Sequence, residues 1–514
     1  MTATQDQQLH AVTSNNVVLE SEVVPATVVY SPATGKIVSI IRKDEVISAA
    51  AATGATIDET EFYEEALRAL GVDPENHRNL EDLVLMPGIV DSHVHLNEPG
   101  RTEWEGFETG TKAAATGGVT TVIDMPLNAI PPTTTVANFQ RKLAAAENQC
   151  WVDVGFWGGI VPDNAADLVP LVNAGVRGFK CFMIESGVDE FPAVEDADIM
   201  RAMQTLRNEK TIVMFHAEKD CTSHNHGGAG AEAKQVESAD QKQLDPATYD
   251  AFLTSRPDDM ELAAIRTVIK LSATAPELPL HIVHLASAEA LPTIAAAQAA
   301  GVPLSVETCF HYLTFAAENI PPRATQYKCC PPIRAAANNE ALWDALLRTG
   351  EIGTVVSDHS PCTPVLKDLE NGDYMQAWGG ISSVGLGLPI LWTGIQKRTS
   401  KQHLGNDGTN TGFVSFADIA RWICANTAKQ VGLFASKGSI AVGKDADFCI
   451  FDPNDTLIVD QSVLPFKNKL TPYHGSKLNG LVRETILRGR TVFSVTDGHV
   501  PVPTGALLLE KRTV

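Results

Sequence analysis

The stretch Asp91-Ser-His-Val-His95 ends an apolar run that begins at Leu83. Side chains on a β-strand alternate between its two faces, so His93 and His95 project to the same side. Neutral imidazole is a preferred donor for zinc-like ions, and two imidazoles on one face at the end of a strand form a pair of metal ligands. Asp91 shares their parity and could orient one of the imidazoles. The spacing therefore predicts one side of a metal site.

Four more side chains with metal-binding chemistry follow strand-like runs later in the chain: Lys180, His216, His284 and Asp358. A protonated lysine has no lone pair and repels cations. A deprotonated lysine can instead add carbon dioxide and become a carbamate, which is an anion able to bridge two ions. We therefore expect Lys180 to be modified to N6-carboxylysine and to bridge two divalent metal ions.

The remaining side chains divide between the two ions. One ion is expected to be held by His93, His95 and Asp358, and the other by His216 and His284. A hydroxide bridging two cations has a lowered pKa and would be the nucleophile. Asp358 lies beside it as the candidate general base, which later donates the proton to the leaving nitrogen. This set of residues predicts a metal-dependent hydrolase.

Two further histidines lie next to these candidates. His281 is three residues before His284, so on a strand it would face the opposite side, either outward or into the packed core. His359 follows Asp358 with the opposite parity, and we expect it to support a ligand rather than to bind metal.

The candidate ligands need a scaffold that brings strand ends together. Between Pro87 and about Phe434, strand-like and helix-like segments alternate, which is typical of parallel strands joined by crossover helices. Eight strands are expected: Val84–His95, Thr120–Met125, Val152–Trp157, Gly178–Met183, Thr211–His216, His281–Leu285, Leu304–Thr308 and Thr354–Asp358. Seven helices are expected between them: Phe107–Thr116, Asn138–Ala146, Ala165–Asn173, Ala197–Arg207, Met260–Ala273, Ala288–Ala299 and Asn339–Arg348. This pattern predicts a (β/α)₈ barrel, whose catalytic groups lie at the carboxyl ends of the strands.

Both ends of the chain have a different, β-rich pattern. The expected terminal strands include Asn16–Glu20, Thr27–Tyr30, Ile37–Arg42, Asp447–Phe451, Thr456–Val459 and Glu484–Val492. The predicted fold class is therefore α/β, a (β/α)₈ TIM barrel with a small β-sandwich domain built from both chain termini. Residues 1–86 would form the N-terminal part of the sandwich with a helical insertion at Asp58–Leu70, residues 87–435 the barrel, and residues 436–514 the C-terminal part. The connection Asp220–Asp258 is expected to pass over the barrel mouth.

Composition limits the classes of partner. The 514-residue chain has a formal net charge of -22, which argues against nucleic acid or an anionic membrane as a partner. The charge says nothing positive about the small-molecule substrate that a hydrolase requires. Its nine cysteines are scattered without a Cys-x-x-Cys pair, and the N-terminus lacks the features of a signal peptide. No apolar run approaches membrane-spanning length. We therefore expect a cytoplasmic protein.

Several stretches resemble the cyclic amidohydrolases of the amidohydrolase superfamily and, among these, the allantoinase family. They are His93–Phe107, Gly117–Asn128, Gly178–Phe182, His216–Glu218, Ser305–Cys309, Ser357–Cys362, Ala377–Ile381 and Gly443–Asp447. The resemblance implies two divalent metal ions, usually zinc, and a carboxylated Lys180. It also implies hydrolysis of the hydantoin ring of allantoin to allantoate in purine breakdown. Related enzymes are often homotetramers, so a homo-oligomer is expected.

Relatives with other substrates differ at positions that have a physical interpretation. Dihydroorotases typically carry an arginine, which clamps a carboxylate, at the position of Asn97; an asparagine suits a neutral, urea-bearing ring. Hydantoinases and dihydropyrimidinases typically carry a tyrosine five residues after the bridging lysine, where this chain has Glu185. Asn97, Asn128 and Ser360 each lie just beyond a strand end and are the candidates for hydrogen bonding to substrate.

Other interpretations are compatible with parts of this pattern. Another cyclic amidohydrolase, acting on dihydroorotate, a dihydropyrimidine or hydantoin, is disfavoured by Asn97 and Glu185. A mononuclear deaminase of the same superfamily is disfavoured by Lys180. A metal-free scaffold related to dihydropyrimidinases is disfavoured because all six ligands are present. Arg101 could reach the barrel mouth or pair with Glu103 or Glu105.

Overall fold

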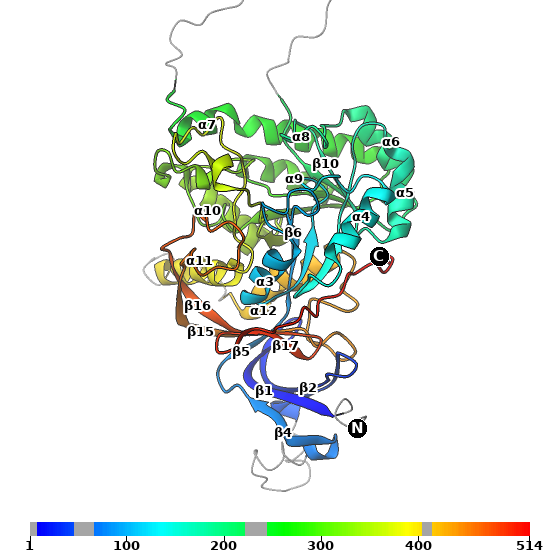
Figure 1. Cartoon of the computed structure of the whole chain (residues 1–514), viewed down its shortest axis with the longest axis vertical. Coiled ribbons are helices and arrows are strands. Elements are labelled where there is room, and N and C mark those ends of the chain that lie inside the picture. Colours follow the sequence, from blue (N-terminus) through cyan, green and yellow to red (C-terminus); the bar gives the residue numbers. More distant parts are fainter. Residues whose placement is uncertain (1–7, 46–65, 221–243, 403–413, 514) are drawn as a thin grey trace, which may run out of the picture.

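The computed structural model describes residues 8–45, 66–220, 244–402 and 414–513. A β-rich part, made from both ends of the chain, lies below a larger part in which strands alternate with helices (Figure 1). The predicted helical insertion at Asp58–Leu70 lies mostly outside the described residues, although residues 66–69 are helical. The predicted limits between domains, at residues 86/87 and 435/436, stay a prediction.

The strands of the larger part are parallel and almost entirely buried. The first sheet contains β6 (Ile89–Val94), β7 (Val119–Asp124) and β8 (Asp153–Phe156). The second contains, in spatial order, β9 (Gly158–Gly159), β10 (Phe179–Phe182), β11 (Val213–His216), β12 (Leu280–Ile282), β13 (Leu304–Cys309) and β14 (Thr354–Val356). Strands covered on both faces have continuous apolar sequences, and each of the eight predicted strands overlaps one of these nine. The ninth, the two-residue β9, lies just beyond the predicted Val152–Trp157.

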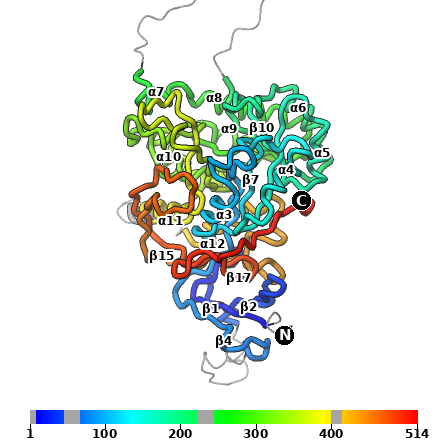
Figure 2. Tube along the Cα trace, in the orientation of Figure 1, coloured from blue at the N-terminus to red at the C-terminus, as the bar shows by residue number. Residues whose placement is uncertain are grey.

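The two sheets approach each other in the manner of a TIM barrel, but the strands do not pair into one continuous ladder. On one side, a parallel bridge joins Val94 of β6 to His359, and the His95 amide donates to the His359 carbonyl at 2.7 Å. On the other side, Leu507 of the C-terminal segment forms a parallel bridge with Val154 of β8. The C-terminal segment therefore occupies part of the edge that β8 would offer to β10. Figure 2 shows this red segment rising beside the cyan part of the trace.

The predicted first strand, Val84–His95, is divided in two. Its first part, β5 (Val84–Pro87), belongs to the β-rich sheet, and its second part is β6. The division falls at Gly88, where a Cβ atom would lie 2.2 Å from the Thr120 hydroxyl oxygen. Only glycine allows the chain to pass so close to β7 as it changes sheets.

Helices follow the strands and cover the sheets (Figure 1). The seven predicted helices correspond to α3 (Phe107–Thr116), α4 (Val136–Ala146), α5 (Ala165–Ala174), α6 (Asp196–Leu206), α8 (Asp258–Leu271), α9 (Leu291–Ala299) and α10 (Ala336–Asp344). The structure adds α7 (Tyr249–Ser255), α11 (Gly387–Gln402), α12 (Phe416–Ala420) and α13 (Asn426–Gln430). Local signals explain several ends: the Thr135 hydroxyl accepts a bond from the Asn138 amide at the start of α4, and Gly175 ends α5 in a left-handed conformation.

The β-rich part takes strands from both termini, as predicted. Its N-terminal strands are β1 (Leu9–Val18), β2 (Val23–Ser31), β3 (Lys36–Arg42), β4 (Val72–Asn79) and β5. Its C-terminal strands are β15 (Phe448–Ile458), β16 (Lys477–Leu487), β17 (Arg490–Ser494) and β18 (Gly498–His499). They pair in the order β18-β17-β16-β15-β5-β1-β2-β3, with β4 also on β1, so the described strands form one nine-stranded sheet.

This sheet encloses an apolar core of its own. Tyr30 of β2 packs edge-on against Phe448 of β15, with ring centroids 5.5 Å apart. Arg78 of β4 forms an ion pair with Glu484 of β16 at 2.6 Å, so strands far apart in the pairing order are close in space. None of the helices among the described residues is long and apolar enough to cross a membrane.

Candidate metal centre

The six predicted metal ligands meet at the carboxyl ends of the parallel strands. His93 lies in β6 and His95 one residue beyond it; His216 ends β11; His284 and Asp358 lie two residues beyond β12 and β14. Lys180 lies deeper, within β10, and its long side chain covers the remaining distance. All six are buried.

One half of the centre is formed by His93, His95 and Asp358. Their ligand atoms lie within 4.8 Å of one another, which is close enough to bind one ion. Nε2 of His93 is 3.1 Å from Oδ1 of Asp358, and Nε2 of His95 is 3.6 Å from the same oxygen. The carboxylate therefore lies between two imidazoles, and the three side chains offer a mixed nitrogen and oxygen donor set that suits a divalent cation.

The other half is formed by His216 and His284. Nδ1 of His216 faces Nε2 of His284 at 2.9 Å. Burial lowers the pKa of both imidazoles well below the ordinary value of 6.5, so both rings are neutral and keep a lone pair for a metal ion. Nε2 of His216 faces Oε2 of Glu218 at 2.7 Å, which places the ring proton there and leaves Nδ1 as the donor atom.

Lys180 lies beside the first half of the centre. Its Nζ is 3.1 Å from Nε2 of His93, and its side chain is buried. Burial lowers the pKa of Lys180, which increases the fraction of neutral amine. A neutral amine is the form that adds carbon dioxide, so the environment of Lys180 fits the predicted carbamate.

Four residues at this end of the barrel have positive backbone φ angles although none is glycine: Asn97, Asn128, His284 and Asp358, at 63°, 68°, 39° and 43°. Such conformations are strained and cluster at functional sites. Because β12 has ended at Ile282, strand parity no longer applies to His284. His281 is fully buried, which is the second of its two expected positions, and its Nε2 faces Oε2 of Glu307 at 2.9 Å.

Asp91 and His359 were expected to support the metal ligands, but other groups make the contacts expected of their side chains. Asp91 does not touch an imidazole, because its Oδ1 accepts bonds from the backbone amides of His93 and Ser357, both at 3.3 Å. The His93 ring is held by Glu307, whose Oε1 lies 2.5 Å from Nδ1. His359 supports His95 through its backbone carbonyl, while its ring faces Glu105.

A cavity of about 230 Å³ opens onto the centre. Two of the predicted substrate-binding residues, Asn128 and Ser360, line it together with Glu185. The third, Asn97, is buried outside this lining, with Nδ2 3.4 Å from the Pro361 carbonyl oxygen. Asn128 also contacts the centre directly, since its amide nitrogen is 3.3 Å from Nδ1 of His95.

Several residues of the cavity wall were not among the predicted site residues. They are Arg256, Lys328 and Cys330, together with Trp378 of the Ala377–Ile381 stretch. Arg256 lies near the end of the connection Asp220–Asp258 and forms an ion pair with Glu218 at 2.6 Å. The same Glu218 carboxylate contacts the ligand His216, so it links Arg256 to the centre. Neither residue type nor spacing marked Arg256, Lys328 or Cys330, because loops bring these residues to the cavity.

Arg101 also has partners that the sequence did not indicate. It pairs with Glu190 and donates to the Asn128 carbonyl at 2.9 Å, instead of pairing with Glu103 or Glu105. His224 and His226, in the long connection, lie outside the described residues.

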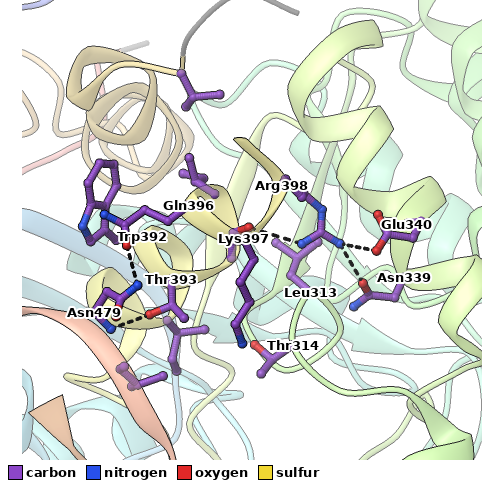
Figure 3. A pocket seen from close by; sticks show the side chains of 15 residues that line it. Leu313, Thr314, Asn339, Glu340, Trp392, Thr393, Gln396, Lys397, Arg398 and Asn479 are labelled. Carbon is purple, nitrogen blue, oxygen red and sulfur yellow. Dashed lines mark hydrogen bonds and ion pairs between the residues drawn. The ribbon is translucent and has the colours of Figure 1, made fainter. Parts of the chain in front are cut away.

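A larger hollow of about 900 Å³ lies elsewhere, beside α11 (Figure 3). Several of its polar groups are engaged: Arg398 points to Glu340 at 2.8 Å and Asn339 at 3.1 Å, and the Asn479 backbone amide donates to Thr393 at 2.7 Å. Its described lining contains neither histidine nor cysteine. The smaller cavity over the six buried ligands is therefore the better candidate for catalysis.

Comparisons with known proteins point to one family. Residues 84–492 match the model of the amidohydrolase family. An allantoinase of Saccharomyces cerevisiae is 47% identical over 506 residues, covering 98% of this chain and 99% of the relative. An allantoinase of Streptomyces avermitilis is 46% identical over 432 residues, covering 84% and 89%. The solved structure of an L-hydantoinase (dihydropyrimidinase) from Arthrobacter aurescens has a TM-score of 0.77 and 26% identity, covering 97% of this chain and 99% of that one.

Proposed function

The chain belongs to the amidohydrolase family, and we propose that it acts as an allantoinase, hydrolysing the hydantoin ring of allantoin to allantoate. The observation that carries this proposal is the identity of 47% to an allantoinase over nearly the whole of both chains. The buried cluster of ligands at the strand ends supplies the matching chemistry.

A second candidate, another cyclic amidohydrolase, is favoured by the structural likeness to an L-hydantoinase. The cavity counts against it, because its described lining has Glu185 and no tyrosine that could stabilise an oxyanion in the manner of hydantoinases.

The donor set fits two divalent metal ions, with zinc as the metal we propose. One would be held by His93, His95 and Asp358, the other by His216 and His284, with carboxylated Lys180 between them. When bound, such ions polarise the ring carbonyl and lower the pKa of an adjacent water. The chain itself supplies the neutral imidazoles, the buried amine and the carboxylate that make this binding possible.

Asp358 is the residue we propose as general base and acid. Its carboxylate lies between His93 and His95 and lines the cavity, so it can take a proton from water and pass it to the leaving ring nitrogen. Burial raises the pKa of Asp358, but the neighbouring imidazoles outweigh burial and hold it well below its usual value. The carboxylate is therefore ionised, which is the form that a general base requires.

Asn128 and Ser360 are the residues we propose for holding the substrate. Both line the cavity, and Oδ1 of Asn128 is buried without a hydrogen-bond partner among the described residues. An unpaired amide oxygen at this position can accept a hydrogen bond from a ring N–H or a ureido N–H of allantoin. Asn97 stays a candidate that would act from outside the cavity lining.

Turnover by the purified, metal-replete protein tests the proposed substrate. Allantoin, dihydroorotate, dihydrouracil and hydantoin are offered separately, and the ring-opened product of each is measured. We expect preferential conversion of allantoin. Preferential conversion of another ring would replace the proposed substrate, and the absence of turnover with two metal ions bound would refute a cyclic-amide substrate from this set.

Substitution of Asp358 tests its role in proton transfer. Asp358→Asn keeps the size of the side chain but cannot accept the proton, so we expect kcat to fall by about 100-fold or more while at least one ion stays bound. Elemental analysis of the variant and its steady-state kinetics supply the two measurements. Turnover near that of the wild type would exclude Asp358 as the base.

We further propose a cytoplasmic homo-oligomer, with a homotetramer as the expected form. The eight described cysteines are all free, which supports a reducing compartment. Light scattering on the purified protein measures the assembly directly.

We also propose that the two parallel sheets together form one (β/α)₈ barrel. The bridge between Val94 and His359 supports this proposal, because it joins the first sheet to the segment that follows β14.

A further inference from the structure

A buried carboxylate, Glu307, lies beneath the candidate metal centre. It belongs to β13 and is fully inaccessible to solvent. Its Oε1 is 2.5 Å from Nδ1 of His93 and accepts a bond from the backbone amide of His284 at 3.2 Å. These two residues belong to different halves of the centre, so a single oxygen atom contacts both halves.

We propose that Glu307 is a positioning residue that sets the geometry of both metal sites at once. The proposal rests on the two-metal function proposed above. Through the His93 ring, Glu307 fixes the tautomer, because a proton on Nδ1 leaves the lone pair of Nε2 directed at Lys180 and Asp358. A carboxylate behind an imidazole also increases the basicity of the donor nitrogen.

Glu307 reaches the second half through the backbone. His284 lies two residues after β12 and has a φ of 39°, which a non-glycine residue adopts only when other contacts hold it. The bond from its amide to Glu307 is such a contact. It supports the turn that directs Nε2 of His284 toward His216.

Other groups immobilise Glu307 itself. Its second oxygen, Oε2, faces Nε2 of His281 at 2.9 Å, and Nδ1 of His281 faces the Ser305 hydroxyl at 2.7 Å. Gln430 contributes a longer contact, 3.5 Å from its Nε2 to Oε2. One oxygen is therefore held by the protein interior, while the other is directed at the ligands.

Two other buried glutamates provide matched comparisons. Glu218 touches one ligand ring, that of His216, and forms an ion pair with Arg256. Glu261 is equally buried and forms an ion pair with Arg334 at 2.8 Å, but its other bonds go to the amides of Ala286 and Ser287. The three glutamates thus contact both halves, one half and neither half of the centre.

The experiment compares Glu307→Gln, Glu218→Gln and Glu261→Gln with the wild type. Zinc per chain is measured by elemental analysis after dialysis, and zinc affinity by competition with a chelator. Glutamine keeps the volume but removes the charge and one acceptor. We expect Glu307→Gln to bind both ions about 10- to 100-fold more weakly, Glu218→Gln to weaken one ion only, and Glu261→Gln to bind both like the wild type.

Melting temperatures with and without zinc separate positioning from a general structural role. A positioning role reduces the increase in melting temperature that zinc produces in Glu307→Gln. A structural role lowers both melting temperatures equally and leaves that increase unchanged, which would overturn the proposal. Wild-type zinc affinity in Glu307→Gln would also overturn it.

Failure of the proposed two-metal site gives a different result, because the wild-type protein itself would then lack two bound ions, whereas a different substrate would leave both ions in place. If Glu307→Gln does not fold, His281→Gln replaces it, since this change removes the main partner of Oε2 and leaves every metal ligand in place. We expect His281→Gln to lose zinc to the chelator several-fold faster than the wild type. An unchanged rate would refute the role of Glu307.

Discussion

The side chains of the centre are buried polar groups, each of which would destabilise the fold if it had no partner. Lys180 is buried beside His93, and two of the imidazoles are kept neutral by burial. Buried, unpaired groups of this kind destabilise a fold unless a bound cation or a chemical modification compensates them. The most informative substitutions are therefore those that remove one compensating partner.

Replacing Lys180 tests the carbamate. Lys180→Ala should lose metal and activity together, and short carboxylic acids such as formate or acetate should restore part of both, because they place a carboxylate in the vacated space. Elemental analysis and turnover with and without added acid measure the effect.

Lys142→Ala is the matched control for Lys180→Ala, since Lys142 is equally buried but pairs with Asp124. It should lose stability while keeping metal and gaining nothing from added acid. Full activity and metal content in Lys180→Ala would contradict the bridging role.

His311 provides a pH-dependent prediction. It is fully buried, neither ring nitrogen has a partner among the described residues, and burial lowers its pKa to about 4. Because the unfolded chain binds a proton below pH 6.5 and the folded chain does not, this residue stabilises the fold above pH 6.5. The contribution, roughly 3 kcal/mol, is lost as the pH falls from 6.5 to 4.

The measurement compares the free energy of unfolding of wild type and His311→Gln, both without metal, at pH 7 and pH 4. The difference between the two proteins should change by roughly 3 kcal/mol, with the wild type losing more stability in acid. Parallel pH profiles for the two proteins would show that His311 does not titrate in this way.

At the scale of elements, the site depends on how closely loops pass behind the strand ends. Gly380 has a φ of 145°, and a Cβ atom there would lie 2.1 Å from the Ser360 carbonyl oxygen. The Ser360 amide in turn donates to Ile381 at 2.9 Å, so the two segments are paired beside the cavity. A methyl group added at Gly380 must displace the backbone of Ser360. Because Ser360 is only two residues after Asp358, this displacement should also disturb the metal centre.

Gly380→Ala should therefore lower kcat by about tenfold or more and destabilise the fold by about 1–3 kcal/mol. Gly443→Ala is the control, because Gly443 also has a positive φ, 86°, but no atom lies within 4 Å of the added Cβ. Gly443→Ala should lower the free energy of unfolding by about 1–2 kcal/mol through backbone strain and should keep wild-type turnover. Equal kinetics for the two variants would show that the approach of Gly380 to Ser360 is unimportant.

At the scale of the whole molecule, one buried lysine joins the barrel to the β-rich part. Lys437 contacts Asp153 of β8 at 2.6 Å, Asp445 at 2.9 Å and Asp447 at 2.7 Å. Burial lowers the pKa of Lys437, but the three carboxylates outweigh burial and raise it above its usual value. The lysine stays charged, and it compensates acids from both parts of the chain.

Lys437→Met should destabilise the protein by about 3–5 kcal/mol, because it removes a counter-charge shared by three largely buried carboxylates, of which Asp153 still pairs with Arg488 and Asp445 with Lys36. The loss should be smaller at pH 4 than at pH 7, because burial raises the pKa of Asp447 and its protonation removes a buried charge. Lys36→Met is the control: Lys36 pairs with the same Asp445 but is 43% exposed, so its loss costs less than about 1 kcal/mol. Urea denaturation measures both variants, and similar losses would contradict the proposed role of Lys437.

The sequence by itself determined the elements and the residue types of the centre. Eight buried strands were visible as apolar runs, and seven helices by their periodicity, because both signals are local. The six candidate ligands were found because chemistry at the ends of consecutive strands must converge in this class of fold. The structure brings all six together.

Only the tertiary structure decided which groups support and enclose the centre. Glu307 lies 214 residues from His93 and 23 from His284, and Arg256 lies 38 residues from Glu218, so folding brings each of them to its partner. Glu218 is only two residues from His216, but its contact with that ring was not predicted. Strand parity does not extend to His284 because β12 ends at Ile282, and the edge of β8 is partly occupied by the C-terminal segment, a long-range pairing. Local periodicity fixes which face a residue occupies within an element, whereas contacts between distant elements depend on how the whole chain packs.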